Sequence, residues 1–146
     1  MKIFIGADHN GFDLKEQLEK HLKNQGHEVV DKGNQQLDKD DDFPMFGAQV
    51  ATSVLAEDGS MGILLCGSGQ GVCIAANRFK GIRASLVWDE EEAKSSRNDD
   101  DSNIICLPAR ELSFDNAKNL VDTWLKTPFA GATRFQRRIK QLDDLT

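Results

Sequence analysis

The sequence predicts an α/β protein with an α/β/α sandwich fold, and two observations support this prediction. Five short apolar runs occur along the chain, at Ile3–Ile5, Glu28–Val30, Gly62–Cys66, Ile82–Val87 and Asn103–Leu107. Each run is short and apolar enough to be a strand that is buried on both faces. Amphipathic segments lie between the runs. Strand and helix therefore alternate about five times with short connections, which indicates an open parallel sheet covered on both sides.

The segments between the strands show the spacing of helices that lie on a sheet. Apolar residues recur at near-helical intervals at Phe12, Leu14, Leu18 and Leu22, and again at Phe46, Val50, Val54 and Leu55. Such stripes are typical of helices with one buried face. A further helix should begin near Val72, another should include Ala93–Ser96, and a terminal helix is expected within Phe129–Leu142, the only basic segment.

The composition fits a single domain and excludes several classes of function. A chain of 146 residues can bury one core without disulfides or a structural metal, so we expect one domain over residues 1–146. The net charge of −6 and the lack of a basic cluster argue against a nucleic-acid partner. Cys66, Cys73 and Cys106 form no Cys-x-x-Cys pair, which fits a reducing cytoplasm. No apolar run approaches the ~20 residues that span a bilayer, so we expect no membrane association.

In a parallel sheet of this kind, ligands bind beyond the carboxyl ends of the strands. The first strand is followed by Asp8 and His9, which would place a carboxylate and an imidazole at that edge. Capping of the next helix by Asp8 or Asn10 explains the same residues equally well. Both interpretations stand at this point. His21 and His27 fall in or just after the first predicted helix, and we interpret them as surface residues.

The third strand ends in a glycine-rich turn, Cys66-Gly67-Ser68-Gly69-Gln70-Gly71. Three glycines in five residues allow the backbone N–H groups to turn inward beside the positive end of a helix, which favours anion binding. A dinucleotide fingerprint would need glycine at Val72, and a Walker A loop would need Gly-Lys-Ser/Thr. The N–H dipoles favour the thiolate of Cys66, which could then act as a nucleophile or a base. The alternative for Cys66 is a buried core residue, and we interpret Cys73 and Cys106 as core.

Two acidic runs were tested as metal sites. Asp38–Asp42 has the spacing of the first EF-hand ligands, but Phe43 and Gln49 stand where that loop needs glycine and glutamate. We therefore reject calcium and interpret this run as a solvated loop. Asp99–Asp101 follows the predicted Ala93–Ser96 helix and is more typical of a solvated turn or a helix cap than of a metal site. We expect neither a metal nor another cofactor.

Ordered blocks along the chain also resemble a known family. They are Gly6–Gly11 with Leu14-Lys15, Asp42-Phe43-Pro44, Cys66–Gly71, Ile74–Arg78 with Gly81–Ala84, Asn103 with Leu107–Arg110, and Gly131–Arg138. From Lys2 to about Ile139 the chain resembles ribose-5-phosphate isomerase B and the related galactose-6-phosphate and allose-6-phosphate isomerases. The resemblance implies a Rossmann-like fold and a metal-independent aldose–ketose isomerase of sugar phosphates. It also implies a homodimer, or a dimer of dimers, in which both chains build each active site.

The resemblance further assigns roles to individual residues. Cys66 would take the proton from the carbon next to the carbonyl and return it to the neighbouring carbon, through a cis-enediolate. The backbone N–H groups of Gly67–Gly71 would hold the developing oxyanion, and Ser68 and Asp8 would manage the hydroxyl protons. The residues expected to bind the substrate phosphate are His9, Arg110, Arg134 and Arg138. The last two lie four residues apart and so share one helix face.

The chain departs from the family at positions that contact the sugar. Asp99 and Asp100 stand where the family has His-Asn, Phe43 stands for a tyrosine, and Phe135 stands for a histidine. Thr133 resembles a one-residue insertion. In the family, the histidine at the position of Asp99 opens the furanose ring of the substrate. The departures therefore concern the residues that recognise the sugar ring and open it.

Three interpretations of these departures stay open. Asp99 could serve as the ring-opening acid if burial or neighbouring carboxylates raise its pKa. The substrate could instead be one that forms no ring, such as a tetrose 4-phosphate. Third, the chain could bind sugar phosphates without turning them over. We expect an isomerase of the ribose 5-phosphate/ribulose 5-phosphate type, with allose or galactose 6-phosphate and a tetrose 4-phosphate as alternative substrates.

Overall fold

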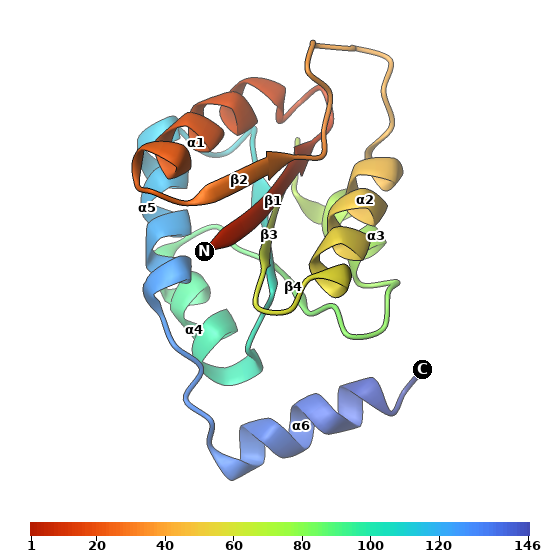
Figure 1. Ribbon diagram of the computed structural model, residues 1–146, viewed down its shortest axis with the longest axis vertical. Coiled ribbons are helices and arrows are strands. Elements are labelled where there is room, and N and C mark those ends of the chain that lie inside the picture. Colours follow the sequence, from red (N-terminus) through yellow and green to blue (C-terminus); the bar gives the residue numbers. More distant parts are fainter.

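Five parallel strands form the central sheet of the computed structural model, which describes residues 1–146 (Figure 1). The strands are β1 (Lys2–Ala7), β2 (Glu28–Asp31), β3 (Met61–Cys66), β4 (Ala84–Leu86) and β5 (Ile104–Pro108). Their order across the sheet is β2-β1-β3-β5-β4, and every neighbouring pair runs parallel. The α/β/α fold with a five-stranded parallel sheet that the sequence predicts is confirmed.

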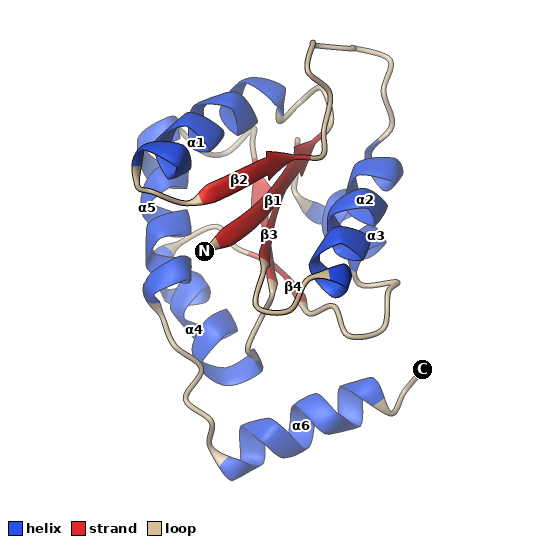
Figure 2. Cartoon of the chain, in the orientation of Figure 1, coloured by secondary structure: helices blue, strands red, loops and turns tan.

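Helices cover both faces of the sheet (Figure 2). They are α1 (Phe12–Asn24), α2 (Phe43–Ala56), α3 (Gln70–Ala76), α4 (Glu90–Asp100), α5 (Phe114–Lys126) and α6 (Thr133–Asp143). Leu18 of α1 and Trp124 of α5 belong to the core on one face of the sheet. Val50 of α2 and Val72 of α3 belong to the core on the other face. The sheet is therefore the middle of three layers.

Strand β3 shows why the central strands are apolar at every position. Ile63 and Leu65 face the α1 and α5 core, whereas Leu64 and Cys66 face the α2 and α3 core. Successive side chains of a strand point to opposite faces, so a strand between two helical layers has no solvated side. Cys66 is the last residue of this strand and therefore lies at the carboxyl edge of the sheet, on the side of α3.

Helix α4 is longer than the Ala93–Ser96 segment that the sequence indicated. Asp89 caps it, since its carboxylate accepts a backbone N–H of the first turn at 2.9 Å. Three glutamates follow in that turn, where they interact favourably with the helix dipole. Asp99 and Asp100 therefore form the end of a helix rather than a turn after it, and Asp101 is its left-handed C-cap with φ of 47°.

Two other boundaries also differ from the prediction. The strand expected over Ile82–Val87 is shorter, because the N–H of Arg83 donates to the side chain of Asn103 at 2.8 Å. The terminal helix begins at Thr133 rather than within the preceding residues, because Gly131 adopts a positive φ of 69°.

The last helix, α6, lies apart from the sandwich, across the end at which the strands begin (Figure 1). Phe135 is its only buried side chain. The linker before it is tethered to α4 by a hydrogen bond from Ala130 N–H to the carbonyl of Asn98, at 3.1 Å. Most of the surface of α6 is therefore exposed, and among its basic residues only Lys140 forms an ion pair, with Asp144 at 2.8 Å.

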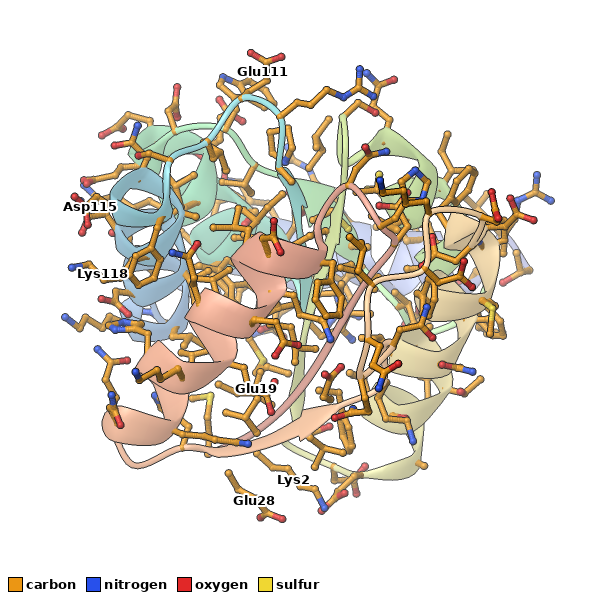
Figure 3. All side chains as sticks on the ribbon, turned by 90° about the horizontal axis from the view of Figure 1, so that it is seen from above. Lys2, Glu19, Glu28, Glu111, Asp115 and Lys118 are labelled. Carbon is orange, nitrogen blue, oxygen red and sulfur yellow. The ribbon has the colours of Figure 1, made fainter.

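Charged side chains surround the sandwich, as the view from above shows (Figure 3). Lys2 lies at one side, where its Nζ is 3.7 Å from Glu28 and 2.8 Å from Glu57. Glu111 and Lys118 lie on the side of α5. Among the helices, none is both long and apolar enough to cross a membrane.

Candidate active site

Most residues predicted to bind or transform a ligand lie at the edge where the strands end. Ala7 at the end of β1 pairs with Leu65 of β3, and Cys66 pairs with Pro108 of β5, so these three strands end at the same level. The turns that follow them are therefore neighbours. The predicted residues at this edge are Asp8, His9, Phe43, Cys66, Gly67, Ser68, Gly69, Gly71 and Arg110.

The turn after β3 presents backbone donors that have no partner in the protein. The N–H groups of Gly67, Ser68, Gly69 and Gly71 donate to no protein acceptor, while that of Gln70 donates to Ser68 Oγ at 3.3 Å. Gly67 and Gly69 are buried. Buried backbone N–H groups are nearly always paired, so the unpaired donors of Gly67 and Gly69, with those of Ser68 and Gly71 beside them, indicate a site for an anion.

Two side chains pack closely on this turn, so that a side chain on Gly67 or Gly71 would displace them. A Cβ on Gly67 would lie 2.6 Å from Arg110 Nε, and one on Gly71 would lie 2.9 Å from the ring of Phe43. Gly69 adopts a left-handed conformation with φ of 74°, which favours glycine independently of space. The turn therefore has a guanidinium on one side and an aromatic ring on the other.

Asp8 organises the turn after β1 and does not cap α1. It is buried, with 6% of its surface exposed, and its Oδ1 accepts the N–H of Asn10 at 2.9 Å. The N-cap of α1 is Gly11, and no side chain caps the helix. The helix-capping interpretation of Asp8 and Asn10 is thus wrong. A carboxylate at this buried position lies at the same edge as Cys66, where it can exchange a proton with a bound hydroxyl.

His9 is held by a residue that the sequence analysis missed. Its Nδ1 lies 2.8 Å from Asp41 Oδ1, and its backbone N–H donates to the same oxygen at 2.9 Å. The Asp41 side chain is only 6% exposed, so the interpretation of Asp38–Asp42 as a solvated loop is wrong at this residue. The hydrogen bond to Asp41 raises the pKa of His9, as do the negative charges of Asp8 and Asp41.

Four predicted site residues lie at the opposite edge of the sheet. Asp100 ends α4 just before β5 begins, and the length of β5 separates this edge from Cys66 by on the order of 13 Å. The pKa of Asp100 is raised by burial and by the charge of a neighbouring aspartate, although Arg138 and Arg83 oppose the shift. The residues of this second group are Asp99, Asp100, Arg134 and Arg138. Within one chain the two groups do not meet.

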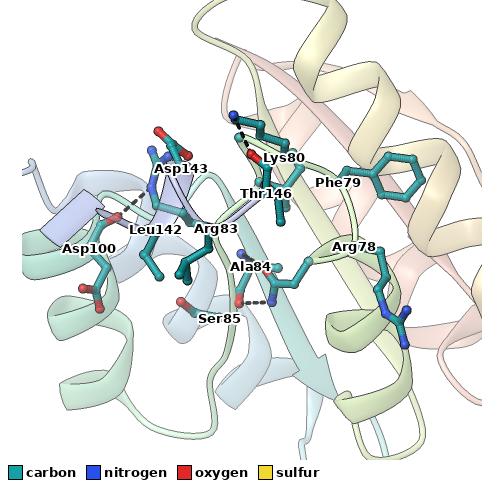
Figure 4. A pocket seen from close by; sticks show the side chains of 14 residues that line it. Arg78, Phe79, Lys80, Arg83, Ala84, Ser85, Asp100, Leu142, Asp143 and Thr146 are labelled. Atoms are coloured by element: carbon teal, nitrogen blue, oxygen red, sulfur yellow. Dashed lines mark hydrogen bonds between the residues drawn. The ribbon is translucent and has the colours of Figure 1, made fainter. Parts of the chain in front are cut away.

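A cavity of about 420 Å³ opens at this amino edge, between the end of α6 and the loop that joins α3 to β4 (Figure 4). Asp100 and Leu142 line it, and Arg83 Nε donates to the carbonyl of Asp100 at 2.8 Å. Lys80 Nζ donates to the carbonyl of Thr146 at 2.9 Å. None of the predicted residues at the carboxyl edge lines this cavity, and of the second group only Asp100 does.

The remaining cysteines and histidines lie outside both groups. Cys106 is fully buried, and burial raises the pKa of its thiol well above the usual value. Cys73 is only half-buried, and its Sγ lies 3.3 Å from the carbonyl of Ala84. His21 is not free at the surface, because its Nε2 lies 3.0 Å from Asp122 Oδ1 and so joins α1 to α5.

The chain is similar to known proteins over nearly its whole length. The model of a family described as Ribose/Galactose Isomerase matches residues 3–142. Ribose-5-phosphate isomerase B of Mycobacterium tuberculosis is 41% identical over 139 residues, which cover 95% of this chain and 86% of that protein. A crystal structure of ribose-5-phosphate isomerase B from Thermotoga maritima has a TM-score of 0.94 at 41% identity, covering 98% of this chain and 97% of that one. The enzyme from Mycoplasma genitalium, with ribulose 5-phosphate bound, gives 0.94 at 41% identity, covering 99% and 95%.

Proposed function

Because the chain belongs to the ribose/galactose isomerase family, we propose that it interconverts an aldose and a ketose sugar phosphate, of the ribose 5-phosphate/ribulose 5-phosphate type. One observation carries the proposal, namely the four unpaired N–H groups in the turn that follows Cys66. An aldose and its ketose interconvert when a proton moves between two adjacent carbons. The enediolate formed on the way carries a negative oxygen, and fixed N–H dipoles stabilise such an oxygen.

Cys66 is the proposed base. Its thiolate takes the proton from the carbon next to the carbonyl, and the electron pair of that C–H bond moves to give the enediolate. The same sulfur then returns the proton to the neighbouring carbon, which was the carbonyl carbon. Asp8 and Ser68 pass the accompanying proton between the two oxygens. The placement of Cys66 as the last residue of β3, directly before the turn, supports this assignment.

His9 and Arg110 are the proposed phosphate ligands from the carboxyl edge, and Arg134 and Arg138 are those from the amino edge. The two pairs can meet only if a second copy of the chain brings its amino edge to this carboxyl edge. We therefore propose a homodimer, or a dimer of dimers, with composite active sites. The exposed side chains of Arg134 and Arg138, which form no ion pair within the chain, support this arrangement.

A tetrose 4-phosphate is the second candidate substrate. Its would-be ring oxygen is esterified, so it needs no ring-opening acid. The observations that favour it are Asp99 at the position of the family's ring-opening histidine and Phe43, which has no hydroxyl, against the turn. If a furanose is the substrate instead, the carboxyl groups of Asp99 and Asp100 must supply the acid. The three free cysteines agree with a reducing cytoplasm as the site of action.

The test is exchange of carbon-bound hydrogen in deuterated water. Purified protein is incubated with ribose 5-phosphate, allose 6-phosphate, galactose 6-phosphate and erythrose or erythrulose 4-phosphate, and incorporation is followed by NMR. Deuterium should enter the carbon next to the carbonyl of one of these sugars, and its ketose or aldose partner should accumulate. Binding of a sugar phosphate by calorimetry, without exchange in any of them, would instead identify a non-catalytic binding protein.

A further inference from the structure

The contact between His9 and Asp41 is part of a longer chain of polar contacts. Asp41 uses one carboxylate oxygen for the ring and backbone of His9 and the other for Asn34, whose Nδ2 donates at 3.0 Å. The carbonyl of Asn34 in turn accepts from Lys15 Nζ at 2.8 Å. These contacts join α1 to the loop after β2, and they join that loop to the end of β1, although the residues lie far apart in the sequence.

Lys15 anchors this chain of contacts in the interior. Its side chain is 0% exposed, and its Nζ also lies 2.5 Å from Asp31 Oδ2 and 3.0 Å from Glu16. A buried lysine requires such partners, because an unpaired ammonium is costly to bury. Asp31 continues the contact into the loop by accepting the N–H of Gly33 at 2.7 Å. The loop that carries Asp41 is therefore fixed at its start by buried charges.

The geometry determines the state of the His9 ring. A carboxylate can only accept, so the Nδ1 that faces Asp41 must carry a proton. Nε2 has no partner in the protein, and the His9 side chain is 32% exposed. When the ring is charged, Nε2 also carries a proton and can donate to an anion. Asp41 therefore leaves one ring nitrogen available, and it favours the charged ring that an anionic ligand needs.

We propose that Asp41, held by Asn34 and the buried Lys15, is a positioning residue that keeps the His9 imidazolium oriented with Nε2–H toward the substrate phosphate. The proposal deepens the proposed function and rests on it, since it takes His9 as a phosphate ligand. Asp41 does not touch the substrate in this role. Its effect on catalysis passes through the orientation and the charge of His9.

The charged groups that face His9 are Asp8, from the end of β1, and Asp41, from the loop. Both favour the protonated ring. Removal of the Asp41 charge should thus return the His9 pKa toward its ordinary value, so that the ring loses its proton at a lower pH. Phosphate binding should then weaken mainly at neutral and alkaline pH, whereas at pH 6 the ring of both proteins is largely protonated.

The test compares Asp41→Asn and Asp41→Ala with Asp40→Asn, an exposed neighbour that makes the same change in net charge. For Asp41→Asn we expect KM to rise about 2-fold at pH 6 and roughly 10-fold at pH 8, because the variant loses the charged ring, and with it one charge-assisted hydrogen bond, at a lower pH. The value of kcat should change less than about 3-fold, because the lost interaction exists before and during the reaction. Asp40→Asn should match the wild type at both pH values.

A second readout does not depend on catalysis. Nitrogen-15 NMR of the ring should show the neutral His9 of the wild type protonated at Nδ1, and in Asp41→Ala the neutral ring should move toward the Nε2–H form. Asn34→Ala should shift the same signal in the same direction by a smaller amount. A wild-type ring protonated at Nε2 would overturn the proposal even if the protein proves inactive on every sugar phosphate. A KM ratio that stays constant from pH 6 to pH 8 in an active enzyme would also overturn it.

Discussion

At the carboxyl edge of the sheet, each predicted site residue is positioned by neighbours from its own chain, whereas at the amino edge the predicted basic residues have few such neighbours. Gly67 packs against Arg110, Gly71 packs against Phe43, and His9 is held by Asp41. At the other edge, the Arg134 guanidinium lies over the ring of Phe135 on the same helix, with its Cζ 4.3 Å from the ring centre, and it forms no ion pair. One half of the site is thus preorganised within the chain, and the other half has few contacts there, so the proposed dimer would have to complete it.

The largest effect is expected for a variant of the preorganised half of the site, at Cys66. Cys66→Ala removes the proposed base without changing the turn, so deuterium exchange should fall by about 10²–10⁴-fold, the range that general acid–base catalysis supplies. Sugar-phosphate binding by calorimetry should stay within about 3-fold of wild type. Cys73→Ala is the control, since Cys73 lies outside the site. Full exchange in Cys66→Ala would assign the base to another residue.

The next largest effect is expected on folding stability, through the buried charges that anchor the loop at the carboxyl edge. Lys15→Met leaves the buried Asp31 carboxylate without its cationic partner, so the free energy of unfolding in urea should fall by about 3–5 kcal/mol. Lys20→Met is the matched control, because Lys20 is exposed on the same helix and should change stability by less than about 0.5 kcal/mol. Equal stability of the two variants would mean that the buried charges do not anchor the loop.

The proposed division of the site between two chains predicts complementation. Arg138→Ala should raise KM by about 10–100-fold, the cost of one charge-assisted hydrogen bond to phosphate. When Arg138→Ala and the inactive Cys66→Ala protein are mixed and allowed to exchange subunits, the mixed dimers should contain one intact site. Activity at low substrate should then rise to roughly a quarter of the wild-type value, as expected for random pairing in a symmetric dimer. No rise after confirmed exchange of subunits would place both groups in one chain.

The smallest expected effect distinguishes the two candidate substrates. Asp99→Asn should change kcat by less than about 3-fold if the substrate has no ring, since no acid is then needed. With a furanose substrate, kcat should fall by at least about 10²-fold, and Asp99→His should restore it. The comparison is made on the sugar phosphate that shows the fastest exchange.

The sequence predicts local features of this protein well, because these depend on neighbouring residues. Apolar runs predict the strands, and three glycines in five residues predict the turn after Cys66. The His9–Asp41 contact could not be predicted in this way, because it joins residues 32 positions apart. One signal was nevertheless present. Lys15 lies three residues before Leu18, on the buried face of its helix, and a lysine there needs an acidic partner from elsewhere in the chain.

The placement of α6 has a consequence for how the protein behaves at different concentrations. Its 11 residues are fewer than the ~12–15 at which an isolated helix becomes stable in water, and its own chain buries only Phe135. The helix that carries Arg134 and Arg138 should thus gain much of its order from the surface of a second copy. Dilution of the protein would then melt part of each active site, and bound sugar phosphate would oppose that melting by mass action. The activity per mole of protein would therefore fall as the protein is diluted.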